Sequence, residues 1–212
     1  MLKRLPVYLL LDTSGSMIGE PVEAVKVGLQ TMLDLLRQEE SNLETVWLSI
    51  ITFDTHVKQI CPLTSLEKFI LPPLNIPQSG ATFLGQALEV LCECYDKELN
   101  LNSSDDRIDW QPLLFILTDG SPSDIGFYRE TLPRVKMRNF GNIVACAAGP
   151  KAKESFLKEL TDVVVSLDTM DSNSLKMYFI KVTETINVGN RSIDSVIDST
   201  IPPPPPIINI VF

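Results

Sequence analysis

Short apolar runs along the chain indicate strands that are buried on both faces of a sheet. Each run is nearly continuous rather than alternating, which is typical of parallel strands covered by helices on both sides. One run follows its predecessor so closely that we expect those two strands to pair antiparallel at an edge of the sheet. The runs lie at residues 5–11, 46–53, 57–61, 113–117, 143–148 and 163–165, the third being the antiparallel one.

Longer segments between these runs carry apolar residues at the spacing of a helix. Leu84, Leu88, Leu91 and Tyr95, for example, fall on one helical stripe. We expect helices at residues 20–36, 84–95, 124–140, 151–160 and 175–186.

Proline, glycine and polar stretches mark the expected breaks. Pro133 should interrupt the helical segment at 124–140, and Gly141 is placed to cap it. Residues 62–77 are a proline-rich connection with a helical turn expected near 66–71, and residues 100–109 are expected to form a loop. Residues 188–200 are polar and aperiodic, so we expect no helix there.

The alternation of strands and helices predicts an α/β fold of the doubly wound, Rossmann-like type. We expect a mostly parallel six-stranded sheet with one antiparallel edge strand and helices on both faces. Residues 1–190 should form this domain, and residues 191–212 an extended tail with a polyproline run at 202–206 and an apolar C-terminus. The proline run is either a stiff spacer or a ligand for a proline-binding groove.

Composition narrows the functional classes. The 212 residues include 27 acidic and 18 basic side chains, a net charge of −9, which disfavours a nucleic-acid groove or an anionic membrane surface. No apolar run is long enough to span a bilayer. The N-terminal apolar run follows Lys3 and Arg4 but stops at Asp12 without a cleavage site, so we interpret it as a strand and expect a cytoplasmic protein.

The four cysteines agree with a reducing compartment. Cys61, Cys92, Cys94 and Cys146 include no CxxC pair, and two cysteines two positions apart in a helix form neither a zinc clamp nor an unstrained disulfide. We expect buried or idle thiols.

Oxygen-bearing side chains gather where strands end. In doubly wound sheets, ligands bind beyond the carboxyl ends of the strands. Asp12, Ser14 and Ser16 follow the first apolar run, Asp119 follows the run at 113–117, and Thr82 precedes a helix. If the first and fourth strands are neighbours, these side chains meet at one edge of the sheet.

Carboxylates and hydroxyls are hard ligands, which suit Mg²⁺ first and Mn²⁺ or Ca²⁺ next. Three neutral hydroxyl ligands would leave much of the cation's charge uncancelled at its open position. We therefore expect the site to attract a third carboxylate from outside the chain.

These elements resemble the metal-ion-dependent adhesion site (MIDAS) of von Willebrand factor type A domains, over residues 5–187. Asp12, Ser14 and Ser16 match its DxSxS element, Thr82 its threonine and Asp119 its last aspartate. The resemblance implies that the three hydroxyls bind the metal directly and the two aspartates directly or through water. An acidic side chain of a partner protein then completes the coordination.

A narrower resemblance is to the bacterial TerY-like proteins of tellurite-resistance clusters. It rests on the start LPVYLLLDTSGSM, the segment ITFDTHV and the proline-rich tail with an apolar tip. It implies a cytosolic domain encoded beside a protein kinase and a metal-dependent protein phosphatase, acting in stress response or phage defence.

Several of these residues, taken singly, also have a purely structural interpretation. Asp12 and Ser14 alone could cap a turn, Asp54 is expected to be a turn acceptor, and Asp124 to cap its helix or lie at the rim of the site. His56, the only histidine, is expected at the surface. The GxSxG, GxxxxGK[ST] and GxGxxG motifs are absent.

We therefore expect an interaction module rather than an enzyme, with no catalytic residue, nucleic-acid partner or membrane partner. Two alternatives stay open. One is a Mg²⁺-dependent phosphoryl-transfer hydrolase with Asp12 as nucleophile, although such enzymes place a second aspartate where Ser14 stands. The other is a scaffold that acts through its C-terminal tail.

Overall fold

The structure, a computed structural model, describes residues 2–76, 80–99 and 107–195. It confirms the mostly parallel sheet of six strands in the order β3-β2-β1-β5-β6-β7, with β3 antiparallel to β2 at the edge. A short additional strand, β4, pairs with the beginning of β1. The strands are β1 Leu2–Asp12, β2 Val46–Phe53, β3 Val57–Ser65, β4 Arg107–Asp109, β5 Leu113–Thr118, β6 Asn142–Ala148 and β7 Val164–Leu167.

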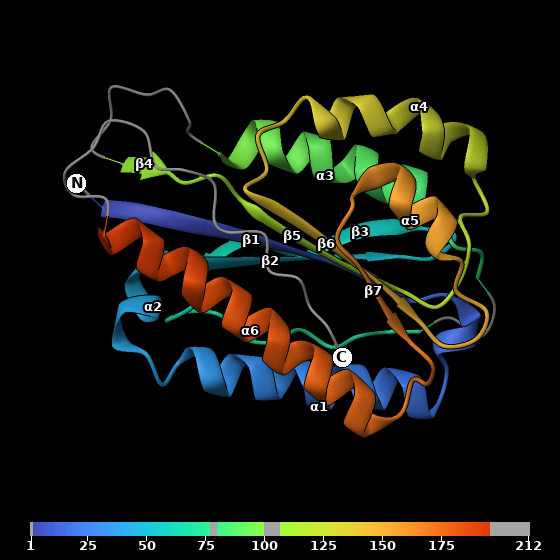
Figure 1. Cartoon of the computed structure of the whole chain (residues 1–212), viewed down its shortest axis with the longest axis horizontal. Helices are drawn as coiled ribbons and strands as arrows, with labels where there is room; N and C mark the ends of the chain where they lie inside the picture. Colours follow the sequence, from blue (N-terminus) through green and yellow to red (C-terminus); the bar gives the residue numbers. More distant parts are fainter. Residues whose placement is uncertain (1, 77–79, 100–106, 196–212) are drawn as a thin grey trace.

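Helices cover both faces of the sheet (Figure 1). On one face lie α1 Glu20–Leu36, α2 Glu40–Thr45 and α6 Ser172–Ser195; on the other lie α3 Leu84–Glu98, α4 Ile125–Lys136 and α5 Glu154–Leu160. Among the described residues, no helix combines the length and the apolar character needed to cross a bilayer.

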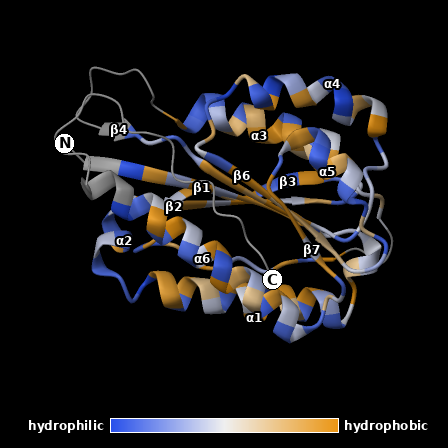
Figure 2. Ribbon diagram, in the orientation of Figure 1, coloured by the Kyte–Doolittle hydropathy of each residue, from blue (hydrophilic) through white to orange (hydrophobic). Residues whose placement is uncertain are grey.

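The apolar run of β1 is explained by burial on both of its faces. Val7, Leu9 and Leu11 pack in the core beneath α1 and α6, whereas Tyr8 and Leu10 pack in the core beneath α3 and α4. Figure 2 shows hydrophobic colour along the central strands, and alternating hydrophobic and hydrophilic colour along the helices that cover them. A strand with two buried faces needs apolar residues at successive positions rather than at alternate ones.

Three local predictions were wrong about extended segments and connections. The segment 100–109, predicted as a loop, contains β4 at its end; residues 100–106 lie outside the described residues. The edge strand continues beyond residue 61 to Ser65, across a register shift against β2. The short helix α2 was not predicted at all, because its sequence ESNLET has no apolar stripe.

Pro133 does not interrupt α4. The helix continues through it to Lys136, and the Met137 amide donates to the Pro133 carbonyl at 3.0 Å. A proline removes only one helical donor, and eight helical residues precede Pro133 in α4. Gly141 does not cap this helix, since its amide donates to the Pro112 carbonyl at 2.9 Å.

The last helix is longer than predicted. α6 runs to Ser195, through the polar segment expected to be non-helical and through the proposed boundary at residue 190. Asn190 is buried because its side chain pairs with two polar groups: it donates to Asn42 Oδ1 at 2.8 Å and accepts from the Thr45 hydroxyl at 2.7 Å. The predicted tail features at 202–206 and 207–212 lie outside the described residues.

The topology places β1 beside β5, and both are parallel. After β1 the chain passes through α1 toward β2, and after β5 it passes through α4 toward β6, on the opposite side of the sheet. The two connections therefore diverge at the carboxyl ends of β1 and β5, which is where doubly wound proteins bind ligands.

Candidate functional site

The loop after β1 presents the first three site residues. Asp12 ends the strand, and its Oδ1 accepts the Ser14 amide at 2.8 Å, which fixes the turn. A 3-10 helix, η1 Gly15–Met17, follows and is anchored by the buried Met17 side chain. The hydroxyls of Ser14 and Ser16 lie 3.1 Å apart, the former buried and the latter exposed. The turn thus aims two hydroxyl oxygens in one direction.

The end of β5 supplies the second carboxylate. Asp119 directly follows the strand, is 6% exposed, and its Oδ1 lies 3.5 Å from the Ser14 hydroxyl. The preceding residue, Thr118, donates its hydroxyl to Asp12 Oδ2 at 2.6 Å. Pairing of β1 with β5 therefore brings together residues that are more than one hundred positions apart in the sequence.

Thr82 reaches the cluster from the segment before α3. Its amide donates to the Ser123 hydroxyl at 3.1 Å, and its carbonyl accepts the Ser123 amide at 2.8 Å, which tie it to the loop after β5. A Cβ at Gly120 would lie 3.2 Å from the Thr82 hydroxyl oxygen. The absence of a side chain at Gly120 thus lets this hydroxyl lie close to the residue that follows Asp119.

The structure brings the predicted residues to one edge of the sheet, where some of them lie closer to one another than others. The Ser14 hydroxyl is within hydrogen-bond reach of both Ser16 and Asp119. Asp12 joins them through the Ser14 amide and through Thr118, and Thr82 lies against Gly120. Sequence reasoning did not identify Thr118 as part of the site. The available signal was its position directly before Asp119, at the end of β5.

The two aspartates of the site are buried, which disfavours their charged forms. The pKa of Asp12 is raised to about 6, mainly by burial and to a smaller extent by the charge of Asp119, while hydrogen bonds from Thr118 and Ser14 oppose the shift. No basic side chain forms an ion pair with either aspartate within the described ranges. Two buried carboxylates without a basic partner are stabilised by a cation.

The donor set fits a hard divalent cation. The described residues contain no group of three or more His, Cys, Asp or Glu side chains that could hold a metal, so a metal here depends on the hydroxyl oxygens. Two carboxylates with three hydroxyls match the oxygen preference of Mg²⁺ and Mn²⁺ and lack the nitrogen and sulfur ligands that most zinc sites use.

Two other acids at this edge have structural roles. Asp54 is a turn acceptor, as predicted: it accepts the His56 amide at 2.8 Å and the Thr13 hydroxyl at 3.1 Å. Asp124 makes no capping bond to its own helix α4. It instead accepts the Gly85 amide at 3.1 Å and the Gln86 amide at 2.9 Å, and so caps α3. The His56 side chain is 93% exposed, as expected.

A depression of about 240 Å³ opens beside the cluster. The site residues Ser16 and Asp119 form one part of its wall, and residues after β6 and β7 form the rest: Ala148, Gly149, Pro150, Lys151 and Met170. Sequence reasoning did not identify this second wall, because its residues carry no motif.

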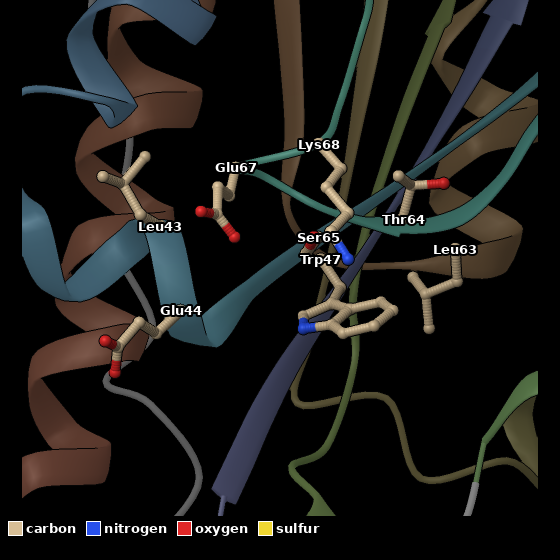
Figure 3. A pocket seen from close by; sticks show the side chains of 8 residues that line it. All are labelled: Leu43, Glu44, Trp47, Leu63, Thr64, Ser65, Glu67 and Lys68. Carbon is tan, nitrogen blue, oxygen red and sulfur yellow. The ribbon is translucent and has the colours of Figure 1, made fainter.

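A larger depression of about 480 Å³ lies at the opposite end of the sheet, around Trp47 (Figure 3). Figure 3 shows the Trp47 indole among the lining side chains, which include Glu44, Glu67 and Lys68. None of the predicted metal ligands lines it. Its size alone therefore gives no reason to place the function there. The smaller depression is the one that adjoins the predicted metal ligands Ser16 and Asp119.

Comparison with known structures identifies the fold. Similar structures include proximal thread matrix protein 1 from the mussel byssus with a zinc-occupied MIDAS motif: identity is 15% and the TM-score 0.65, over 87% of this chain and 48% of that one. A von Willebrand factor type A protein from Catenulispora acidiphila has 14% identity and a TM-score of 0.65, over 86% of this chain and 42% of that one.

The pilus adhesin SpaC from Lactobacillus rhamnosus GG has 14% identity and a TM-score of 0.66, over 88% of this chain and 31% of that one. The chain thus spans less than half the length of each of these proteins, and at such identities the similarity establishes the fold alone. No match was found among curated protein sequences.

The sequence model of the von Willebrand factor type A domain matches residues 7–187, from β1 into α6. That match covers the whole sheet except the start of β1, together with every segment that contributes to the cluster. The chain belongs to the von Willebrand factor type A domain family.

Proposed function

We propose that the protein is a metal-ion-dependent interaction module. A divalent cation, Mg²⁺ foremost, is held by the side chains of Asp12, Ser14, Ser16, Thr82 and Asp119 and accepts a carboxylate from a partner protein. The observation that carries the proposal is the pair of buried aspartates, 2% and 6% exposed, that lie among hydroxyls without a basic partner in the described part of the chain. Domains of this family are generally interaction modules, which supports binding as the function.

The surroundings of Asp12 favour binding over covalent catalysis. Hydrogen bonds to both oxygens of Asp12, from the Ser14 amide and the Thr118 hydroxyl, hold this carboxylate in place, and each oxygen keeps a lone pair for a cation. The position that would carry a general acid in an aspartyl-phosphate enzyme is Ser14. The hydrolase alternative is therefore a weaker candidate than the interaction module.

The first experiment measures metal binding and partner capture together. Mn²⁺ binding is followed by electron paramagnetic resonance, and proteins captured from a lysate of the source cells are compared in Mg²⁺ and in EDTA. Asp119→Asn and Thr82→Ala should each weaken Mn²⁺ binding and the Mg²⁺-dependent capture. Asp54→Asn is the matched control, because it changes an acid at the same edge that lies outside the proposed ligand set.

Capture that is unchanged by EDTA and by Asp119→Asn would refute the proposal. Two further assays separate the alternatives. Turnover of phosphate esters that requires Mg²⁺ and disappears in Asp12→Asn would identify the hydrolase. Loss of capture on deletion of residues 201–212, with Mn²⁺ binding intact, would identify a scaffold that acts through its tail.

The narrower assignment is also part of this proposal: a cytoplasmic role in tellurite resistance or stress response, with a kinase and a metal-dependent phosphatase as partners. It is supported by the sequence resemblance to TerY-like proteins, and its cellular location by four cysteines that form no disulfide. Mg²⁺-dependent copurification with such a kinase or phosphatase would support it. Unchanged tellurite and stress tolerance after deletion of the gene would count against it.

A further inference from the structure

The wall of the depression opposite the metal cluster contains one basic side chain, Lys151. It follows β6 and lines the same depression as Ser16 and Asp119. Lys151 is exposed, and none of the described carboxylates lies within 4.0 Å of its ammonium group. Lys158 nearby differs in this respect, because it is paired with Glu154 at 2.6 Å.

The turn that carries Lys151 is held in place from two sides. The Gly149 amide donates to the Leu167 carbonyl at 2.7 Å, which ties the turn to the end of β7. Gly149 has φ of 84°, in the left-handed region, and a Cβ there would lie 3.2 Å from Met170 Cγ. The Ala152 amide closes the turn by donating to the Gly149 carbonyl at 3.3 Å. Lys151 therefore starts from a backbone position fixed relative to the metal cluster.

The charge of the chain gives this lysine a distinct role. With a net charge of −9, the protein repels acidic partners at long range. A partner segment that binds a cation at the cluster would extend its neighbouring groups toward the depression that Lys151 lines. An unpaired ammonium on a fixed turn is complementary to a second anionic group of that segment.

We propose that Lys151 forms a second anion subsite beside the metal, so that the protein selects partners whose recognition segment carries two carboxylates. One carboxylate completes the metal coordination and the other pairs with Lys151. This inference rests on the proposed function, and it adds the chemistry that distinguishes one acidic partner from another.

The test uses small carboxylates as probes of the full chain loaded with Mn²⁺. Succinate, glutarate and adipate are each compared with their own monomethyl ester, which keeps the length and removes the second charge. Binding is measured from water-proton relaxation, since a carboxylate that binds Mn²⁺ displaces its water. The variants are Lys151→Gln and, as matched control, Lys153→Gln, an exposed lysine that does not line the depression.

A diacid has two equivalent ends that can bind the metal, so it should bind twice as tightly as its monoester even without a second subsite. For at least one diacid, we expect the wild-type protein to show a preference larger than this factor of two, and we call the additional factor the excess. The excess should be about twofold to fivefold at low salt, as for an exposed ion pair. It should vanish in Lys151→Gln, persist in Lys153→Gln and decrease with added salt, while Mn²⁺ affinity stays the same in all three proteins.

Two results would overturn the inference while leaving the proposed function standing. In one, the monoesters bind Mn²⁺ in the protein but no diacid shows an excess. In the other, Lys151→Gln keeps the excess. Failure of every carboxylate to displace water from bound Mn²⁺ would instead overturn both the subsite and the proposed function.

Discussion

Replacement of Asp12 by asparagine should stabilise the metal-free protein at neutral pH while removing its response to metal. The substitution keeps the shape of the side chain and removes its charge. Asp12 is 2% exposed, and burial is the main reason that its pKa is raised from 3.8 to about 6. Without a metal, the ionised carboxylate is therefore a cost to the folded state.

The magnitude follows from the two pKa values. Their difference corresponds to about 3 kcal/mol of unfolding free energy at pH values above 6, because each pKa unit is about 1.4 kcal/mol. The asparagine amide cannot accept the Thr118 hydroxyl as Asp12 Oδ2 does, and the weakened hydrogen bond offsets about 1 kcal/mol. The net gain of Asp12→Asn at pH 7 should be about 2 kcal/mol.

The sign of the pH dependence follows from proton binding. The folded state has the higher pKa, so it binds the proton more tightly, and the wild-type protein gains stability from this residue as the pH falls from 7 to 4. Asparagine does not titrate. The advantage of Asp12→Asn should therefore shrink through this window and reverse near pH 4, where the weakened hydrogen bond remains.

Urea denaturation in EDTA, at pH 7, 6, 5 and 4, measures these differences. A parallel series in Mg²⁺ should stabilise the wild-type protein and leave Asp12→Asn nearly unchanged, because a cation that binds only the folded state adds stability by mass action. Thr118→Val should instead lower the free energy of unfolding, because it removes the hydrogen bond to Asp12 and keeps the buried charge. An Asp12→Asn protein that is less stable than wild type at pH 7, by an amount independent of pH, would refute the reasoning.

Gly28→Ala should destabilise the protein by about 1–3 kcal/mol in urea denaturation, because its Cβ would lie 2.3 Å from Phe179 Cδ2 between α1 and α6. Gly126→Ala in α4 is the control: its Cβ meets nothing within 4 Å, so the better helix former should be neutral or stabilising. Arg4→Ala should cost about 3–5 kcal/mol, because it breaks the buried ion pair between Arg4 and Asp109, and a loss below 1 kcal/mol would contradict this. A thiol reagent should label only the partly exposed cysteine of β3 in the native protein and all four cysteines in urea; rapid native labelling of a second cysteine would contradict the buried positions.

The sequence predicted the sheet well because its strands are buried on both faces. The run that contains Val7, Tyr8 and Leu9 must be apolar at successive positions in order to fill two cores, and such a run is visible without any structure. The edge strand β3 was harder to delimit, because its residues are only partly buried and carry a mixed pattern up to Ser65.

The wrong predictions concern segments whose structure depends on distant partners. The C-terminal part of α6 looked non-helical because Asn187 and Asn190 break its apolar stripe. In the fold these side chains pair with Asn42 and Thr45, which are roughly 145 positions away. Asp124 was expected to cap its own helix or to lie at the rim of the site; its side chain accepts hydrogen bonds from two amides of α3 and so caps that helix.

The sequence by itself determined which oxygen-bearing residues follow the strands, and such oxygens suit a hard divalent cation. Only the tertiary structure decided that Ser14 and Asp119 lie 3.5 Å apart, that Thr82 lies beside Gly120, and that Lys151 lines the same depression. The reason is that strand order is set by packing between distant segments. Local residue patterns report burial and turns, whereas the pairing of β1 with β5 is a property of the whole sheet.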